Sequence, residues 1–111
     1  MLFRSVAAFQ PVLAFSRVVT NTGSAWRVAL TITNTGGSSA TSVQVLTSKL
    51  GVTNTSMATP ISVGTIAAGG NAVVNIDFPL AAATSGVPVV HRVTGDYTGN
   101  TFATAARVTP P

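Results

Sequence analysis

Residues 28–37 read VALTITNTGG, and residues 38–45 read SSATSVQV. These two stretches decide the fold. Apolar side chains alternate with Ala and Thr up to an Asn-Thr-Gly-Gly turn, after which a second β-rich run begins. A period of two places successive side chains on opposite faces of a strand. Asn and Gly tolerate the positive φ angles that reverse a chain between strands. The two stretches therefore predict an antiparallel sheet.

The strand predicted at residues 25–34 has one apolar face. This face carries Trp26, Val28, Leu30 and Ile32. The other face carries Arg27, Ala29, Thr31 and Thr33. Because the apolar face must be removed from water, we expect a second layer of structure to cover it.

The composition favours a single all-β domain. The chain has 111 residues, of which 46% are hydrophobic and only 7% are charged, with no Glu and one Lys. Thr and Val suit pleated, half-buried strands, whereas the charged residues that favour helices are almost absent. A chain of this length can bury a core without disulfides or a structural metal. It has no cysteine, so we expect neither a disulfide framework nor thiolate chemistry.

The net charge of +4 at pH 7 does not point to a nucleic-acid partner. Phosphate binding needs several cations that converge on one surface. The chain instead spreads its arginines one to a predicted strand, at Arg17, Arg27, Arg92 and Arg107. The positive balance reflects the scarcity of acids, which are Asp77 and Asp96 alone. We therefore expect no nucleic-acid partner.

The first residues fit neither a signal peptide nor a membrane span. The apolar run in residues 1–16 is interrupted by Gln10 and Pro11, has no clear cleavage pattern and is too short to cross a bilayer. Residues 2–5, Leu-Phe-Arg-Ser, are also the translation of a common sequencing-adaptor end. We therefore expect residues 1–5 to be an assembly scar and residues 1–10 to form a disordered or truncated segment.

Further strands follow from apolar runs that are bounded by turn residues. They are predicted at residues 11–19, 41–50, 61–66, 71–78, 87–97 and 101–108. In the first of them Leu13 and Phe15 share one phase whereas Val18 is out of it, so we expect a kink or bulge there. Residues 51–59 form a polar loop with room for a short edge strand. Residues 79–86 are too short a connection for a stable helix.

Seven short strands at this spacing predict two packed antiparallel sheets in a Greek-key β-sandwich over residues 11–109. The longer connection between the fifth and sixth strands fits the crossing that a Greek key requires. A parallel α/β arrangement would need amphipathic helices, and the sequence contains none. The predicted core consists of Trp26, Val28, Leu30, Ile32, Val43, Val45, Val74, Ile76, Phe78, Val89, Val93, Phe102 and Val108.

Two stretches are similar to bacterial immunoglobulin-like repeats of the cell-adhesion-related (CARDB-like) type. One comprises residues 28–36 and 40–45, and the other is residues 63–76, which read VGTIAAGGNAVVNI. In that family a Leu-Gly-x-Ile/Leu-Ala-x-Gly stretch precedes the strand that closes one sheet. The resemblance covers roughly residues 11–109 and implies a seven-stranded immunoglobulin-like sandwich.

The resemblance also implies a function. Modules of this type are non-catalytic structural or adhesive units, so we expect the chain to be the C-terminal domain of a larger secreted or cell-surface bacterial protein. Its expected partners are neighbouring domains of that longer chain and a protein or glycan ligand. The family has no shared catalytic residues to carry over, and a fold alone does not fix a function.

The residues that carry chemistry are too few for an enzyme. A hydrolase needs a nucleophile, a base and an orienting group. His91 is the only imidazole and shares the phase of Val93, which predicts a neutral core histidine with one hydrogen bond. Asp77 lies opposite the apolar phase, and Asp96 with Asn100 supplies at most two of the six or more oxygens that calcium requires. We therefore expect no catalytic site, no metal and no cofactor.

Four residues are candidates for contact with a ligand or partner. Exposed aromatic rings stack on sugars, which makes Trp26 and Tyr97 candidates, although the phase of Trp26 favours the core. Arg92 and Arg107 lie on strands that are predicted to pair across the hairpin at residues 98–100. Both can then face outward and form a small cationic face for an acidic glycan or a neighbouring domain.

Two other functions stay open at the level of sequence. A carbohydrate-binding accessory module predicts an exposed aromatic platform. A filament subunit predicts that residues 6–19 complete the sheet of a neighbouring molecule, because exposed sheet edges accept an added strand.

Overall fold

The structure is a computed structural model, and it describes residues 10–111. Its elements in chain order are β1 (Leu13–Asn21), β2 (Ala25–Asn34), β3 (Ala40–Leu50), β4 (Thr53–Asn54), β5 (Ile61–Ile66), β6 (Asn71–Pro79), the 3₁₀ turn η2 (Leu80–Ala82), β7 (Val89–Tyr97) and β8 (Asn100–Val108). The assembly scar predicted at residues 1–5 lies outside the described residues, as do residues 6–9 of the segment predicted to be disordered.

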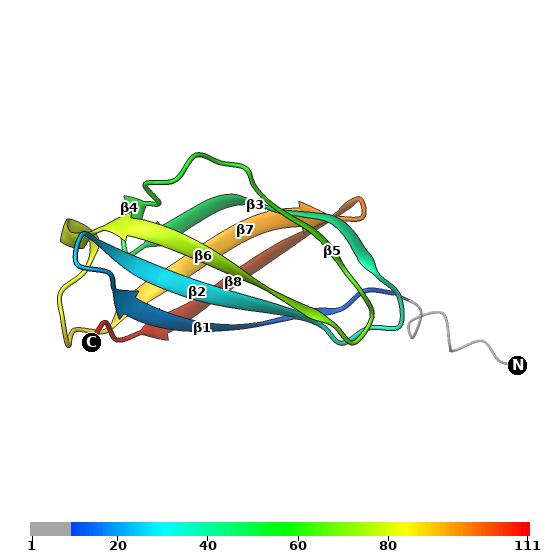
Figure 1. Ribbon diagram of the computed structural model, residues 1–111, viewed down its shortest axis with the longest axis horizontal. Helices are drawn as coiled ribbons and strands as arrows, with labels where there is room; N and C mark the ends of the chain where they lie inside the picture. Colours follow the sequence, from blue (N-terminus) through cyan, green and yellow to red (C-terminus); the bar gives the residue numbers. More distant parts are fainter. Residues whose placement is uncertain (1–9) are drawn as a thin grey trace, which may run out of the picture.

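Two antiparallel sheets form the molecule (Figure 1). One sheet has the order β1-β2-β6. The other has the order β4-β3-β7-β8, with β5 paired to β3 along the same edge as β4. The predicted all-β fold of two antiparallel layers is confirmed. The two-residue strand β4 lies in the polar loop where a short edge strand was expected.

The strands run lengthwise, so the sandwich has two distinct ends (Figure 1). At the first, the entry end, Thr35 N donates to Val12 O at 2.8 Å, which ties the first described residues to the β2–β3 connection. At the second, the exit end, Gly86 N donates to Pro110 O at 2.7 Å, which ties the last residues to the β6–β7 connection. The described chain therefore begins and finishes at opposite ends of the sandwich.

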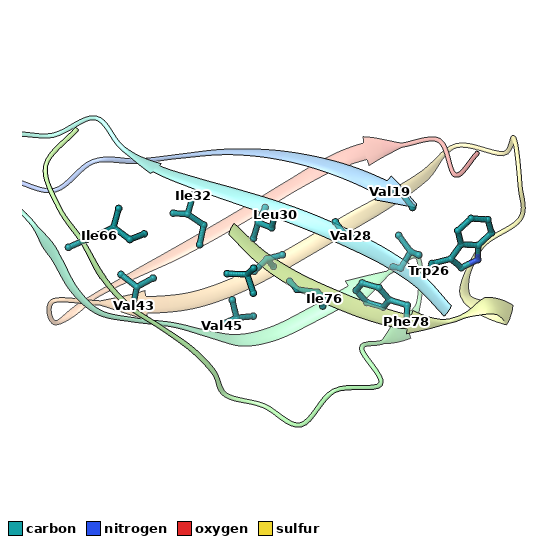
Figure 2. Packing of buried hydrophobic residues seen from close by; sticks show 14 residues of the cluster. Val19, Trp26, Val28, Leu30, Ile32, Val43, Val45, Ile66, Ile76 and Phe78 are labelled. Atoms are coloured by element: carbon teal, nitrogen blue, oxygen red, sulfur yellow. The ribbon is translucent and has the colours of Figure 1, made fainter. Parts of the chain in front are cut away.

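The core lies between the sheets and is built from alternate residues of each strand (Figure 2). In β2, every second side chain from Trp26 to Asn34 is buried, as the alternation predicts. Ten of the thirteen predicted core residues are buried: Trp26, Val28, Leu30, Ile32, Val43, Val45, Val74, Ile76, Phe78 and Val93. The other three, Val89, Phe102 and Val108, are half-buried and pack against the same cluster. Each buried aliphatic side chain contributes about 1.5–3 kcal/mol to folding.

Strand β1 contains neither the kink nor the bulge that was predicted. It pairs with β2 in one continuous register, from Leu13 opposite Asn34 to Asn21 opposite Trp26. The alternation is intact because Arg17 occupies an inward position between the apolar residues, where its guanidinium group is hydrogen-bonded. Val18 consequently faces solvent and is 63% exposed. The kink was predicted because Val18 is out of phase with Leu13 and Phe15, but the buried residue is Val19, which is in phase with them.

The irregular strand is β3. Its register with β5 shifts between Ala40 and Val43 and again between Val43 and Gln44, and its register with β7 shifts between Val45 and Thr47. Ser42 has a positive φ of 52°, a conformation that is uncommon outside glycine. Bulges of this kind bend a strand and redirect its side chains.

Asn34 is a buried polar residue that fixes the entry end. Its side-chain Oδ1 accepts from Val12 N at 3.2 Å and from Gly36 N at 3.0 Å. Its Nδ2 donates to Ser38 O at 2.7 Å and to Ile66 O at 3.1 Å. The amide therefore uses both of its donors and both acceptor positions, as a fully buried group requires. Asn34 was predicted only as the last residue of the strand and the first of the turn, and its side-chain role was not predicted.

Candidate binding surface

The outer face of the five-stranded sheet carries a row of polar side chains near the entry end. On β3, Gln44 lies opposite Ser62 of β5 on one side and opposite Asp96 of β7 on the other. Asp96 lies opposite Thr101 of β8. The four residues therefore form a single row across four strands, which we call the polar row.

A groove with a volume of about 610 Å³ lies over the polar row. The groove is lined by the β7–β8 turn at one side and by residues of β3 and β5 at the other. Its further polar lining residues are Ser42, Thr65, Thr98 and Asn100. The lining is thus rich in hydroxyl and carboxamide groups, with one carboxylate.

The β7–β8 turn is held against the start of β3. Thr98 N donates to Thr41 O at 2.9 Å, and Thr41 N donates to Thr98 Oγ1 at 2.8 Å. Thr98 and Gly99 have φ values of 46° and 74°, the pair of positive angles that a type I′ turn requires. A β-branched residue is unfavourable in that conformation, so these two hydrogen bonds help to hold a strained wall of the groove in place.

The side chains of the polar row make no hydrogen bond to any other described residue. On the same face, the Thr47 and Thr94 hydroxyl groups are hydrogen-bonded to each other across β3 and β7. Among residues 10–111, the only ion pair joins Arg27 and Asp77. Asp96 therefore forms no ion pair with a described residue. The hydrogen-bonding capacity of the polar row is therefore open to a ligand or to water.

The two aromatic candidates lie in different places. Tyr97 is half-buried and is one of the residues that line the groove, and its ring centroid lies 6.2 Å from that of Phe102 on the inner face. Trp26 is only 4% exposed and lies at the exit end, where its Nε1 donates to Leu80 O at 3.0 Å (Figure 2). Trp26 is a core residue and offers no exposed ring for stacking.

Arg92 and Arg107 face outward on the same sheet, nearer the exit end than the polar row. Both are exposed, and each lies opposite a small or apolar residue, since Arg92 pairs with Ala105 and Arg107 with Val90. Lys49 on β3 lies directly opposite Arg92 and is also exposed. Lys49 is thus a third cation on this face, beside Arg92. It was not predicted from the sequence, because the pairing of Lys49 with Arg92 depends on the bulge in β3.

His91 is fully buried in a polar network that joins the two sheets. Arg17 Nη1, from β1, lies 3.1 Å from His91 Nδ1 and donates to His91 O at 3.1 Å. Arg17 Nη2 donates to Thr104 Oγ1 of β8 at 2.6 Å. On the other side of the ring, His91 Nε2 lies 3.0 Å from Ser48 Oγ of β3. The predicted core position of His91 is thus confirmed, but the ring has two partners instead of one.

The partners of His91 assign its tautomer. Arginine has only donors, so Nδ1 must accept the hydrogen bond from Arg17, and Nε2 carries the proton that is donated to Ser48. Burial, together with the charge on Arg17, lowers the pKa of His91 from 6.5 to about 4. Burial also lowers the pKa of Arg17. The imidazole is therefore neutral at physiological pH and serves as a structural link.

The three residues that a hydrolytic site would need lie apart. His91 is in the core, whereas Asp77 is on the outer face of the three-stranded sheet and Asp96 is on the outer face of the other sheet. Arg27 Nε donates to Asp77 Oδ1 at 2.8 Å, and this hydrogen bond lowers the pKa of Asp77. The structure does not bring the imidazole and the two carboxylates to one place.

Within residues 10–111, no group of three or more His, Cys, Asp or Glu side chains is arranged to hold a metal ion. No helix in the same range has the length and hydropathy that a membrane crossing requires. Comparison of the chain with models of known families and with curated proteins finds no match.

Proposed function

We propose that the protein is a non-catalytic structural module of the immunoglobulin-like type, which spaces or presents the parts of a larger exported protein or assembly joined to it. The observation that carries the proposal is the placement of the two ends of the described chain. Residues 10–12 are bound to the entry end and residues 110–111 to the exit end of a sandwich whose strands run lengthwise (Figure 1). Such a module separates what is attached to it by about the length of a nine-residue strand, or about 30 Å.

The direction of the terminal strands supports a role under tension. A pull on residue 10 acts along β1, which pairs with β2 over nine residues. A pull on residue 111 in the opposite direction acts along β8, which pairs with β7 over nine residues. Each strand is then sheared along its partner, so that many hydrogen bonds are loaded together instead of one after another.

The experiment is single-molecule force spectroscopy with handles on introduced cysteines, which are unique because the chain has none of its own. The Gln10→Cys, Pro111→Cys variant loads the molecule end to end. The matched control, Gln10→Cys with Thr35→Cys, places both handles at the entry end and peels β1 from β2. We expect a clearly higher unfolding force for the first variant. Equal forces, or unfolding at low force in both geometries, would contradict a spacer that resists tension.

Assembly by strand addition would require β1 to leave its own sheet. Leu13–Asn21 is already paired with β2 of the same chain, and Phe15 stacks on Phe102 with ring centroids 5.3 Å apart. Donation of this segment to a neighbouring molecule would break that pairing. The spacer is therefore the reading that we favour over the filament subunit.

A further inference from the structure

We propose that the groove over the polar row is a binding site for a neutral, hydroxyl-rich glycan. The inference goes beyond the spacing function and does not depend on it. It rests on the position of Gln44, Ser62, Asp96 and Thr101 in one row beneath a groove of about 610 Å³. None of these four side chains makes a hydrogen bond to another described residue.

The chemistry of the lining suits a ligand that both donates and accepts hydrogen bonds. A carboxamide such as that of Gln44 offers two donors and one acceptor oxygen, and the hydroxyls of Ser62 and Thr101 do both. The carboxylate of Asp96 only accepts, and its two oxygens suit adjacent hydroxyl groups that donate. Sugars present such groups at regular intervals along a chain.

The charge of the groove selects against acidic ligands. Asp96 is its one charged group, and no described cation pairs with it. Among residues 10–111, the nearest cations on the same face are Lys49 and Arg92, which lie five residues from Gln44 along β3 and four residues from Asp96 along β7, beyond the groove lining. A phosphate, sulfate or uronic acid would therefore be repelled at the polar row. A neutral glycan meets no such penalty.

The dimensions and rigidity of the site fit an extended ligand. Four neighbouring strands span three inter-strand spacings, or about 14 Å. The wall formed by the β7–β8 turn is fixed to β3 through Thr41 and Thr98. A site that is ordered before binding loses less entropy when the ligand arrives. Because no aromatic side chain lies in the polar row itself, we expect hydrogen bonding to dominate and the affinity to be weak, with a dissociation constant on the order of 1 mM.

The test is a titration followed by backbone-amide NMR, with cellohexaose, xylohexaose and mannohexaose as neutral probes and hexagalacturonate as the acidic probe. We expect at least one neutral hexaose to shift the amide signals of residues 42–44, 62–65 and 96–101. Trp26 lies at the opposite end of the sandwich, so its fluorescence should not change. Hexagalacturonate should not shift the amide signals of the residues that line the groove.

Two variants locate the site. Asp96→Asn keeps the shape of the side chain but removes its charge and one acceptor, so binding should weaken by about tenfold or more. Arg92→Gln, on the same face but outside the polar row, is the matched control and should bind as the parent does. The undisturbed spectrum of the rest of each variant verifies its fold.

Three results would overturn the proposal. The first is the absence of groove shifts with all three neutral hexaoses at about 10 mM, a concentration well above the expected dissociation constant. The second is shifts centred on Arg92 and Arg107, which would assign binding to these cations instead of the groove. The third is equal affinity of the Asp96→Asn variant and the parent. None of these results would bear on the force measurements that test the spacer.

Discussion

At the scale of single residues, the buried polar groups explain most of what is specific to this sandwich. His91 and Asn34 are both fully buried, and each links elements that are distant in the sequence. A buried polar group left without partners costs about 1–3 kcal/mol, so these residues penalise any arrangement that does not pair them. They select one packing among the many that an apolar core alone would tolerate.

The stability of the protein should fall on mild acidification because of His91. Its pKa is about 4 in the folded state and 6.5 when the chain is unfolded, so the unfolded state binds more protons between these values. The free energy of unfolding is then fully present above pH 6.5 and falls as the pH drops towards 4, by about 3 kcal/mol at most. Urea denaturation at a series of pH values measures the loss.

The control for this pH dependence is His91→Gln, which keeps a hydrogen-bonding side chain without the titration. It should be less stable than the parent at pH 7 but nearly constant in stability between pH 6.5 and 4. Asp77, whose pKa is lowered in the folded state, affects stability in a separate pH range. Its contribution to the free energy of unfolding is lost only as the pH falls below 3.8. A parent profile that stays flat from pH 6.5 to 4 would contradict the assignment of His91.

Replacement of Asn34 should be severely destabilising. The Asn34→Ala variant leaves the amides of Val12 and Gly36 and the carbonyls of Ser38 and Ile66 without their partner. We expect a loss of about 3 kcal/mol or more in the free energy of unfolding, measured by urea denaturation. Asn75→Ala, an exposed position on β6, is the matched control and should change stability by less than about 0.5 kcal/mol. Similar values for the two variants would contradict the role of Asn34.

At the scale of elements, the alternation of side chains was enough to predict where the strands lie. The bounds of β2 and β5 agree with those predicted. In β2 the alternation is uninterrupted, and β5 lies between clear turn residues although its alternation breaks at Gly64. The bulges of β3 could not be predicted in the same way. They depend on how β5 and β7 pair with β3, and such long-range pairing leaves no local pattern in the sequence.

The candidate site was less accessible to sequence reasoning than the fold. The polar row gathers residues from four strands, so it becomes visible only when their registers are known. The role of Gly95 also depends on contacts with other strands. A side chain at this position would collide with the ring of Phe102 and the carbonyl of Gln44. In the sequence it is simply a glycine within a strand.

The continuous register of β1 can be tested with two neighbouring valines. Val18 is 63% exposed and Val19 is 9% exposed. Val18→Thr should therefore alter the free energy of unfolding by less than about 0.5 kcal/mol, whereas Val19→Thr should cost about 1–2 kcal/mol because it buries a hydroxyl group. Chemical denaturation compares the pair directly. A larger cost at Val18 than at Val19 would restore the kink that sequence analysis expected.

At the scale of the whole molecule, the two sheets form an elongated unit in which the two ends of the described chain are far apart (Figure 1). Both sheets run in the same direction as the line between these ends, and the side-chain network of Arg17, His91 and Ser48 connects the sheets across the core. The proposed spacing role rests on this geometry. The groove and the three cations Lys49, Arg92 and Arg107 lie on the outer face of the five-stranded sheet, along its length.

The most direct test is the distance between two spin labels, placed through Val12→Cys at the entry end and Thr109→Cys at the exit end, and measured by pulsed electron resonance. Because the chain has no native cysteine, each label has one site. We predict a single narrow distribution centred at about 30 Å, the length of a nine-residue strand. A broad distribution, or one centred below about 20 Å, would place the two ends together and contradict the lengthwise sandwich.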